Sequence, residues 1–122
     1  MAKILLVDDM KGVRDAVTFI LERGGHDVAQ AADGLDGLDK LKNRHFDLII
    51  SDVLMPKLDG AEFARRLRES GFHTPLLTIS AGSSEVDADT VLATAAETAN
   101  ATLKKPFSAP ELLAAVEELI AA

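Results

Sequence analysis

The sequence predicts an α/β domain built on a doubly wound, five-stranded parallel sheet, and two observations carry that prediction. Short apolar runs alternate along the chain with segments whose apolar residues recur at helical spacing. The segments between them are short, and strand–helix–strand connections are right-handed, which places helices on both faces of the sheet. A chain of 122 residues is long enough to bury one core of its own.

Five short runs are the expected strands. They cover about residues 3–7, 27–30, 48–51, 76–79 and 101–104. The first and third end at aspartates, the fourth follows Pro75, and the fifth ends at a pair of lysines. Runs of this length, separated by helical patterns, are typical of repeated strand–helix units with a parallel sheet.

The expected helices are marked by apolar stripes and by residues that start or stop a helix. They cover about residues 11–23, 35–43, 61–70 and 84–99, and a fifth opens at Ser108. The first has apolar residues at i, i+4, i+7 and i+8 and is stopped by the glycine pair at 24 and 25. Asp33 and Gly34 form a turn signal before the second. Ser108 and Glu111 have the spacing of a capping box, whereas the fourth helix has only a weak stripe.

Charged residues stand at the ends of three expected strands. Asp8 and Asp9 follow the first strand, Asp52 follows the third, and Lys105 follows the fifth. The carboxyl ends of parallel strands meet at one edge of the sheet, where open α/β folds place ligands. Three carboxylates there repel one another unless a cation holds them, and oxygen ligands suit a hard divalent ion such as Mg²⁺. An aspartate beside Mg²⁺ and a lysine is suited to attack phosphorus.

Composition excludes several other classes of function. A net charge of −7 argues against sequence-independent binding to nucleic acid, and the absence of cysteine excludes disulfides and thiolate metal sites. No apolar run approaches the roughly 18 residues of a membrane span. The first residues lack the long apolar core of a signal peptide. We therefore expect a cytoplasmic protein with neither a nucleic-acid partner nor a membrane partner.

The chain resembles the receiver domain of two-component response regulators over nearly its whole length. The matching motifs, in chain order, are Asp8-Asp9, Asp52 with Met55-Pro56 and Asp59-Gly60 after it, Ser80-Ala81, and Lys105-Pro106. Each motif is weak alone, but their order and spacing together are specific. The resemblance implies a flavodoxin-like fold with strand order 2-1-3-4-5. It also leads us to expect that residues 1–122 form one receiver domain with no output domain.

The resemblance implies a role for each of six residues. The phosphoryl group would be accepted by Asp52 and contacted by Ser80 and Lys105. The protein ligands of Mg²⁺ would be Asp9, Asp52 and the backbone carbonyl of Leu54, with Asp8 acting through a metal-bound water. These roles suit the chemistry, because phosphoryl transfer through a loose transition state needs in-line placement and neutralised oxygens rather than a strong base.

The expected function is that of a stand-alone receiver, a switch that binds a protein partner and catalyses only its own phosphorylation and dephosphorylation. The resemblance implies a histidine kinase or a histidine phosphotransfer protein as phosphoryl donor. Output would use the surface of the fourth helix, fifth strand and fifth helix. The alternative within this class is a phosphorelay intermediate or a phosphate sink.

Two readings from other classes fit the residues less well. A small Mg²⁺-dependent phosphatase or phosphotransferase would use Asp52 as nucleophile, but position 54, where a general acid would stand, is a leucine. A flavin carrier would need a phosphate-binding loop after the first strand, where Asp8 and Asp9 would instead repel the ligand.

Several other polar residues lie outside the matching motifs. Many receivers carry Tyr or Phe three residues before the lysine, where this chain has Thr102, so the usual aromatic switch is absent. Lys104 is expected to be a solvated charge at the end of its strand. The three histidines, which lie at loops and element ends without a ligand partner at metal-binding spacing, are expected at the surface: His26, His45 and His73.

Overall fold

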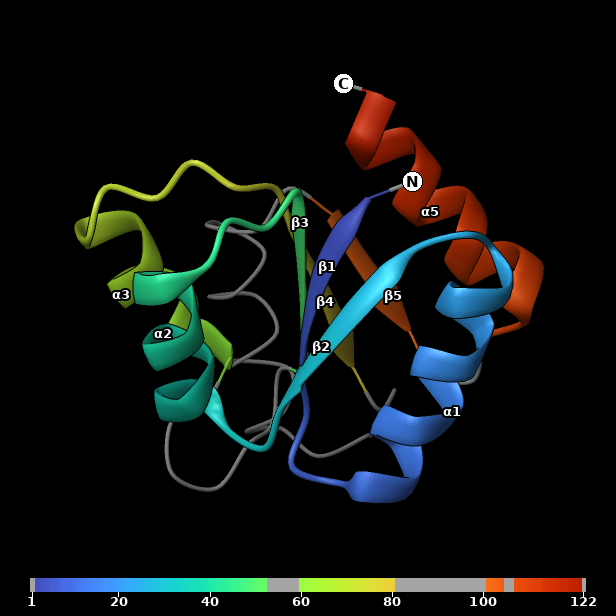
Figure 1. The fold of residues 1–122 in the computed structure, drawn as a ribbon, viewed down its shortest axis with the longest axis horizontal. Coiled ribbons are helices and arrows are strands. Elements are labelled where there is room, and N and C mark those ends of the chain that lie inside the picture. The colour runs from blue at the N-terminus through green and yellow to red at the C-terminus, as the bar shows by residue number, and fades with distance from the viewer. Residues whose placement is uncertain (1, 53–59, 81–100, 105–106, 122) are drawn as a thin grey trace.

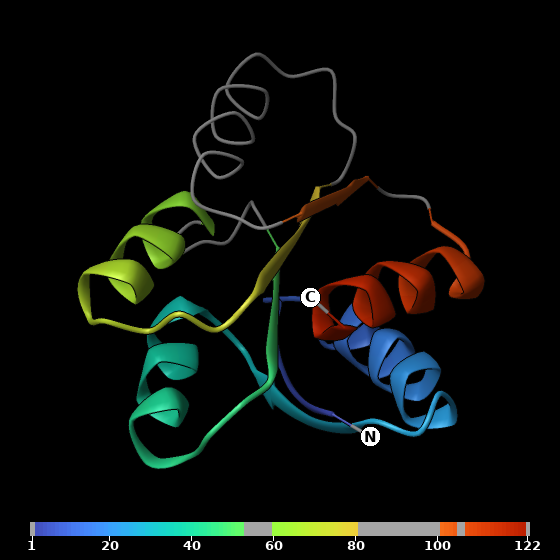
Figure 2. The same ribbon diagram turned by 90° about the horizontal axis from the view of Figure 1, so that it is seen from above.

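The computed structural model describes residues 2–52, 60–80, 101–104 and 107–121, which form a parallel sheet covered by helices on both faces (Figure 1). The strands are β1 (Lys3–Val7), β2 (Asp27–Ala31), β3 (Leu48–Asp52), β4 (Leu76–Ser80) and β5 (Ala101–Lys104). The helices are α1 (Lys11–Arg23), α2 (Gly34–Asn43), α3 (Gly60–Glu69) and α5 (Ala109–Ala121). The sheet order is β2-β1-β3-β4-β5, which confirms the expected doubly wound topology. Seen from above, α1 and α5 lie on one face and α2 and α3 on the other (Figure 2).

The expected elements are present wherever the structure describes them, with bounds that differ by at most one residue. The helix expected at about residues 84–99 lies outside the described ranges. One difference concerns the site, because β3 continues to Asp52, so this aspartate is the last residue of the strand rather than the first of a loop.

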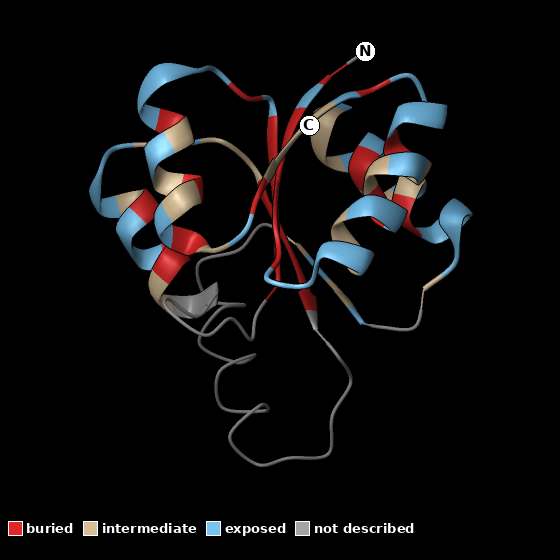
Figure 3. Cartoon of the chain, turned by 60° about the horizontal axis from the view of Figure 1, so that its bottom comes forward, coloured by how far each residue is buried: buried red, intermediate tan, exposed pale blue. Residues whose placement is uncertain are grey.

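The core consists of two clusters, one on each face of the sheet. Leu5, Val7 and Ile49 belong to the cluster under α2 and α3, whereas Ile4 and Leu6 belong to the cluster under α1 and α5. Burial on both faces explains why the central strands are almost continuously apolar. Figure 3 shows this as buried residues along the central strands.

The helix ends are fixed by the residues that the sequence pattern marks. Asp33 caps α2, since its carboxylate accepts the N–H of Asp36 at 2.8 Å. Ser108 and Glu111 form the expected capping box at α5, with bonds of 3.1 and 3.2 Å. The longest helices in the described ranges, α1 and α5, have 13 residues each. Within the part of the chain that the structure describes, no helix is both long and apolar enough to cross a membrane.

His26 contradicts the expectation that the three histidines are surface residues. Its side chain is only 5% exposed, with Nε2 3.2 Å from the Glu117 carboxylate, and Nδ1 accepts the N–H of Ala2 at 3.3 Å. These partners are 91 and 24 positions away in sequence, so local spacing did not reveal them. His45 and His73 are exposed, as expected.

Gly37 allows α2 to pack closely on the core, and this packing leads to a prediction about stability. An added Cβ would stand 3.0 Å from Val7 Cγ2 and 3.2 Å from Phe63 Cε1, and both residues are fully buried. We expect Gly37→Ala to lower the free energy of unfolding by about 1 kcal/mol. Overpacking costs about 1–3 kcal/mol, which outweighs the helix-forming advantage of alanine, about 1 kcal/mol.

Gly12→Ala is the matched control, measured by the same urea-unfolding experiment. Gly12 also lies in a helix, but an added Cβ would meet no atom within 4 Å. We expect this substitution to raise the free energy of unfolding by up to about 1 kcal/mol. Equal stabilisation by the two substitutions would contradict the close packing of α2.

Candidate metal centre

The register of the sheet places Asp8 and Asp52 side by side at its carboxyl edge. Val7, the last residue of β1, is the partner of Ser51 in the neighbouring strand β3. Asp8 and Asp52 each follow these paired residues, so both leave the central strands at the same level. The topology therefore brings together two acidic residues that are far apart in sequence, at the edge where open α/β sheets bind ligands.

Asp9 joins them to complete a cluster of three carboxylates. Each of Asp8, Asp9 and Asp52 offers an oxygen that lies within 4.8 Å of the other two. Asp8 is 1% exposed and Asp52 is 7% exposed, whereas Asp9 is exposed to solvent. The cluster thus has two buried carboxylates at its base and one at its mouth.

This donor set fits a hard divalent cation. Mg²⁺ binds oxygens at about 2.1 Å in octahedral geometry, so two of its ligands lie at most about 4.2 Å apart. The 4.8 Å limit on the cluster is close to that span, so a small adjustment or one bridging water fits all three carboxylates around one ion. Holding two buried carboxylates this close together also favours a cation between them.

The loop that carries Asp8 and Asp9 is held by hydrogen bonds on both sides. The N–H of Asp8 donates to the carbonyl oxygen of Ala31 at 3.1 Å, which continues the pairing of β1 with β2. The Asp8 carboxylate accepts the N–H of Met10 at 3.0 Å. Arg14, in the second turn of α1, donates from Nη1 to the Asp8 carbonyl oxygen at 2.7 Å. The sequence pattern did not identify Arg14, which appears there only as an isolated arginine six residues after Asp8.

The other expected site residues are described only in part. The backbone of Ser80 ends β4 opposite Lys104 of β5, so it lies along the same edge as Asp52. Leu54 and Lys105 fall outside the described ranges, as does Pro106, and their roles stay predictions. Lys104 is exposed at the end of β5, as expected.

Thr102 stands where many receivers carry Tyr or Phe. Its hydroxyl lies 3.0 Å from the hydroxyl of Thr78 in the neighbouring strand β4. Thr78 is fully buried and also lies 3.4 Å from the carbonyl oxygen of Ala101, whereas Thr102 is exposed. A hydroxyl pair therefore links β4 to β5 two residues before Ser80.

Comparisons with known proteins identify the family. A family model described as the response regulator receiver domain matches residues 4–117. The response regulator MprA of Mycobacterium sp. (strain KMS) is 37% identical over 118 residues, which are 97% of this chain and 50% of that protein. The alkaline phosphatase synthesis transcriptional regulatory protein PhoP of Bacillus subtilis is also 37% identical, over 97% of this chain and 48% of its own length. The chain thus spans about half the length of these curated relatives.

Two solved structures match over nearly the whole length of both chains. The chemotaxis protein CheY4 of Vibrio cholerae has a TM-score of 0.84 at 36% identity, and the match covers 98% of each chain. The receiver domain of the sensor histidine kinase PA1611 of Pseudomonas aeruginosa has a TM-score of 0.86 at 27% identity and covers 99% of this chain and 98% of its own. That structure has a magnesium ion coordinated in its active-site cleft. With the strand order and the acidic cluster, these matches show that the chain belongs to the receiver domain family of two-component response regulators.

Proposed function

We propose that the chain is a phosphorylation switch in which Asp52 accepts a phosphoryl group while Asp8, Asp9 and Asp52 hold Mg²⁺. The observation that carries this proposal is the cluster of three carboxylates within 4.8 Å at the carboxyl edge of the sheet. The magnesium ion in the cleft of the PA1611 receiver domain supports the choice of metal. The backbone carbonyl of Leu54 would be the further protein ligand, and Asp8 would act through a water.

The reaction is a displacement at phosphorus. An oxygen of the Asp52 carboxylate attacks the phosphorus of the donor and forms a new P–O bond. The bond from phosphorus to the nitrogen of a phosphohistidine, or to the acyl oxygen of acetyl phosphate, breaks, and the leaving group keeps its electron pair. Mg²⁺ held by the three carboxylates would supply positive charge to the phosphoryl oxygens. Lys105 and Ser80 would then bond the phosphoryl oxygens, the first as a cation and the second as a neutral donor.

The donor would be a histidine kinase or a histidine phosphotransfer protein, and the output would be altered binding of another protein. The surface that we assign to output includes β5 and α5, which expose Thr102, Lys104 and Glu118. The new charge would bias an equilibrium between two states of this surface. Apart from catalysing its own phosphorylation and dephosphorylation, the chain would not act as an enzyme.

A second candidate is a relay or sink that passes or stores the phosphoryl group with little change at its surface. The hydroxyl pair of Thr78 and Thr102 favours it, because a short β-branched side chain stands where a swinging ring would otherwise report phosphorylation. Hydrogen exchange along β5 and α5, with and without phosphorylation, separates the candidates. A switch changes protection there, whereas a relay leaves it unchanged.

Intact mass spectrometry tests the Mg²⁺-dependent phosphorylation that both candidate functions require. The purified chain is incubated with acetyl phosphate, with Mg²⁺ or with excess chelator. We expect the mass of one phosphoryl group to be added in the presence of Mg²⁺ and no addition with chelator. Failure to form this adduct with acetyl phosphate, and also with an autophosphorylated cognate kinase, would refute the proposal.

A further inference from the structure

A chain of hydrogen bonds links α1 and β2 to the backbone of the acidic loop. Arg14 donates from Nη1 to the carbonyl oxygen of Asp8 at 2.7 Å and from Nε to Gln30 Oε1 at 3.2 Å. The Gln30 amide nitrogen donates to Thr18 Oγ1 at 2.8 Å and lies 3.4 Å from Asp15 Oδ1. Gln30 of β2 therefore fixes the Arg14 guanidinium, and the guanidinium in turn holds the loop that follows β1.

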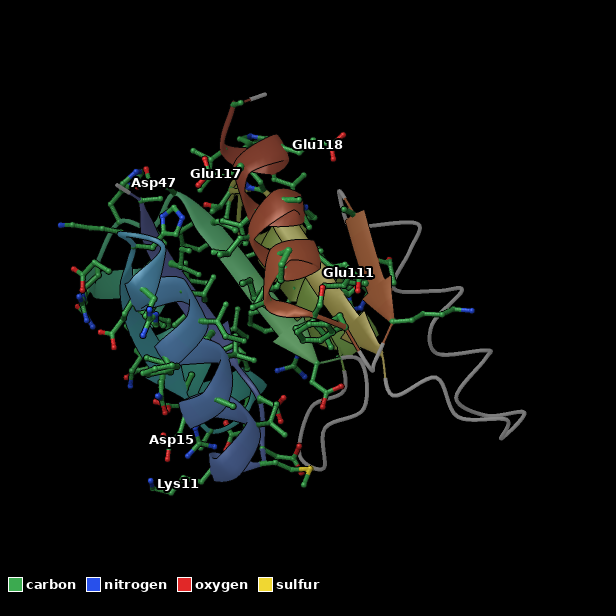
Figure 4. All side chains as sticks on the ribbon, turned by 90° about the vertical axis from the view of Figure 1, so that its right-hand side faces the viewer. Lys11, Asp15, Asp47, Glu111, Glu117 and Glu118 are labelled. Atoms are coloured by element: carbon green, nitrogen blue, oxygen red, sulfur yellow. The ribbon has the colours of Figure 1, made fainter. Side chains whose placement is uncertain are left out.

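Asp15 closes this chain on the solvent side, in the second turn of α1 (Figure 4). Lys11 donates to its other oxygen at 2.7 Å. These hydrogen bonds, first from Lys11 and then from Gln30, hold the pKa of the Asp15 carboxyl below its ordinary value, so it stays ionised near neutral pH. A carboxylate at this place favours the orientation of Gln30 in which its nitrogen faces Asp15 and Thr18 and its oxygen faces Arg14.

We propose that Arg14, oriented by Gln30, is a positioning residue for the metal centre. The inference rests on the proposed Mg²⁺ site. The carbonyl oxygen that Arg14 holds belongs to the peptide that joins Asp8 to Asp9, and this peptide is planar. Its orientation sets the direction in which the chain enters Asp9, and hence where the exposed carboxylate of the cluster lies. The N–H of Asp8, which belongs to the peptide between Val7 and Asp8, already donates to the carbonyl oxygen of Ala31. Arg14 therefore fixes the following peptide, between Asp8 and Asp9.

A purely electrostatic role for Arg14 would have the opposite effect. A guanidinium near a cation site repels the cation, so loss of that charge alone would strengthen Mg²⁺ binding. Loss of a positioning contact would weaken Mg²⁺ binding even though a positive charge is removed. The sign of the change in affinity therefore separates the two roles.

Substitution by lysine separates charge from geometry. Lysine keeps the charge, but its single ammonium lacks the planar fork that reaches both the Gln30 oxygen and the Asp8 carbonyl. Arg23 supplies the matched control, since it lies at the other end of α1 with its guanidinium 5.5 Å from the centre of the Phe19 ring.

The experiment is a calorimetric Mg²⁺ titration of the metal-free chain and of its Arg14→Lys, Arg14→Ala, Gln30→Ala and Arg23→Ala variants. We expect both Arg14 variants to bind Mg²⁺ roughly 10-fold more weakly, as is usual when a residue behind a metal ligand is lost, and Gln30→Ala a few-fold more weakly. Arg23→Ala should match the wild type. Equal or tighter binding by Arg14→Ala would overturn the proposal.

A second readout needs no metal. Amide hydrogen exchange at Asp9 and Met10 should be faster in the Arg14 variants than in the wild type and unchanged in Arg23→Ala. If Arg14→Ala does not fold, as judged by circular dichroism, Arg14→Lys and Gln30→Ala carry the test. Wild type that binds Mg²⁺, with variants that match it in affinity and exchange, would overturn this inference alone. Wild type that does not bind Mg²⁺ would overturn the proposed metal centre and this inference with it.

Discussion

Replacement of Asp52 by asparagine will abolish the Mg²⁺-dependent addition of a phosphoryl group. The carboxylate oxygen of Asp52 is the proposed nucleophile, and the neutral amide of asparagine does not attack phosphorus. The substitution also removes one of the three negative charges of the cluster, which weakens the hold on Mg²⁺. Because asparagine has the same shape, the fold should be retained. Intact mass after incubation with acetyl phosphate and Mg²⁺ measures the result.

Asp39→Asn is the control for this experiment. Asp39 is an exposed aspartate on α2, outside the carboxylate cluster. This variant should gain one phosphoryl group as the wild type does. An adduct of unchanged stoichiometry in Asp52→Asn would show that Asp52 is not the acceptor. Loss of the adduct in Asp39→Asn would show that the effect of removing an aspartate is not specific to Asp52.

Replacement of Phe63 by alanine will lower the free energy of unfolding by about 3–5 kcal/mol. The side chain is fully buried in the cluster under α2 and α3, and truncation of a buried phenylalanine removes apolar contacts and leaves a cavity. Domains of this kind are stable by only about 5–15 kcal/mol, so the loss is a large fraction of the total. Urea unfolding monitored by circular dichroism measures it.

Phe19→Ala removes the same side chain from an exposed place. Phe19 is 61% exposed on α1, where the Arg23 guanidinium lies over its ring. We expect a cost of no more than about 1 kcal/mol, the usual size of an exposed cation–π contact. Similar costs for Phe63→Ala and Phe19→Ala would contradict the assigned packing of α3 on the sheet.

The fold was predictable because its local signals agree with its long-range packing. The apolar runs of β1 and β3 reflect burial on both faces, and the capping box at Ser108 starts α5 as its spacing indicates. Asp33, expected as part of a turn, caps α2. Three strands, β2, β3 and β4, end one residue later than the sequence predicts. β3 includes Asp52 because its pairing with Ile79 of β4 continues the ladder beyond the apolar run.

The site was predictable only where its residues leave strand ends. Asp8, Asp9 and Asp52 come together because the register aligns β1 with β3. Arg14 was not predictable in the same way, since it acts on a backbone carbonyl and its support, Gln30, lies 16 positions away on β2. The partners of His26 are likewise long-range and are fixed by tertiary packing rather than by any local pattern.

The contacts of His26 bear on how phosphorylation at the candidate metal centre would affect groups near the end of α5. They join the start of β1 to the end of α5, so both ends of the described chain lie at the amino edge of the sheet, as Figure 1 shows. α5 has 13 residues, a length of about 20 Å. At 0.1 M salt, charge is screened over about 10 Å. A phosphoryl charge on Asp52, if it forms as proposed, would therefore act only weakly by its field on a solvent-exposed group beyond α5, and its effect there would depend on displacement of β4, β5 or the helix itself.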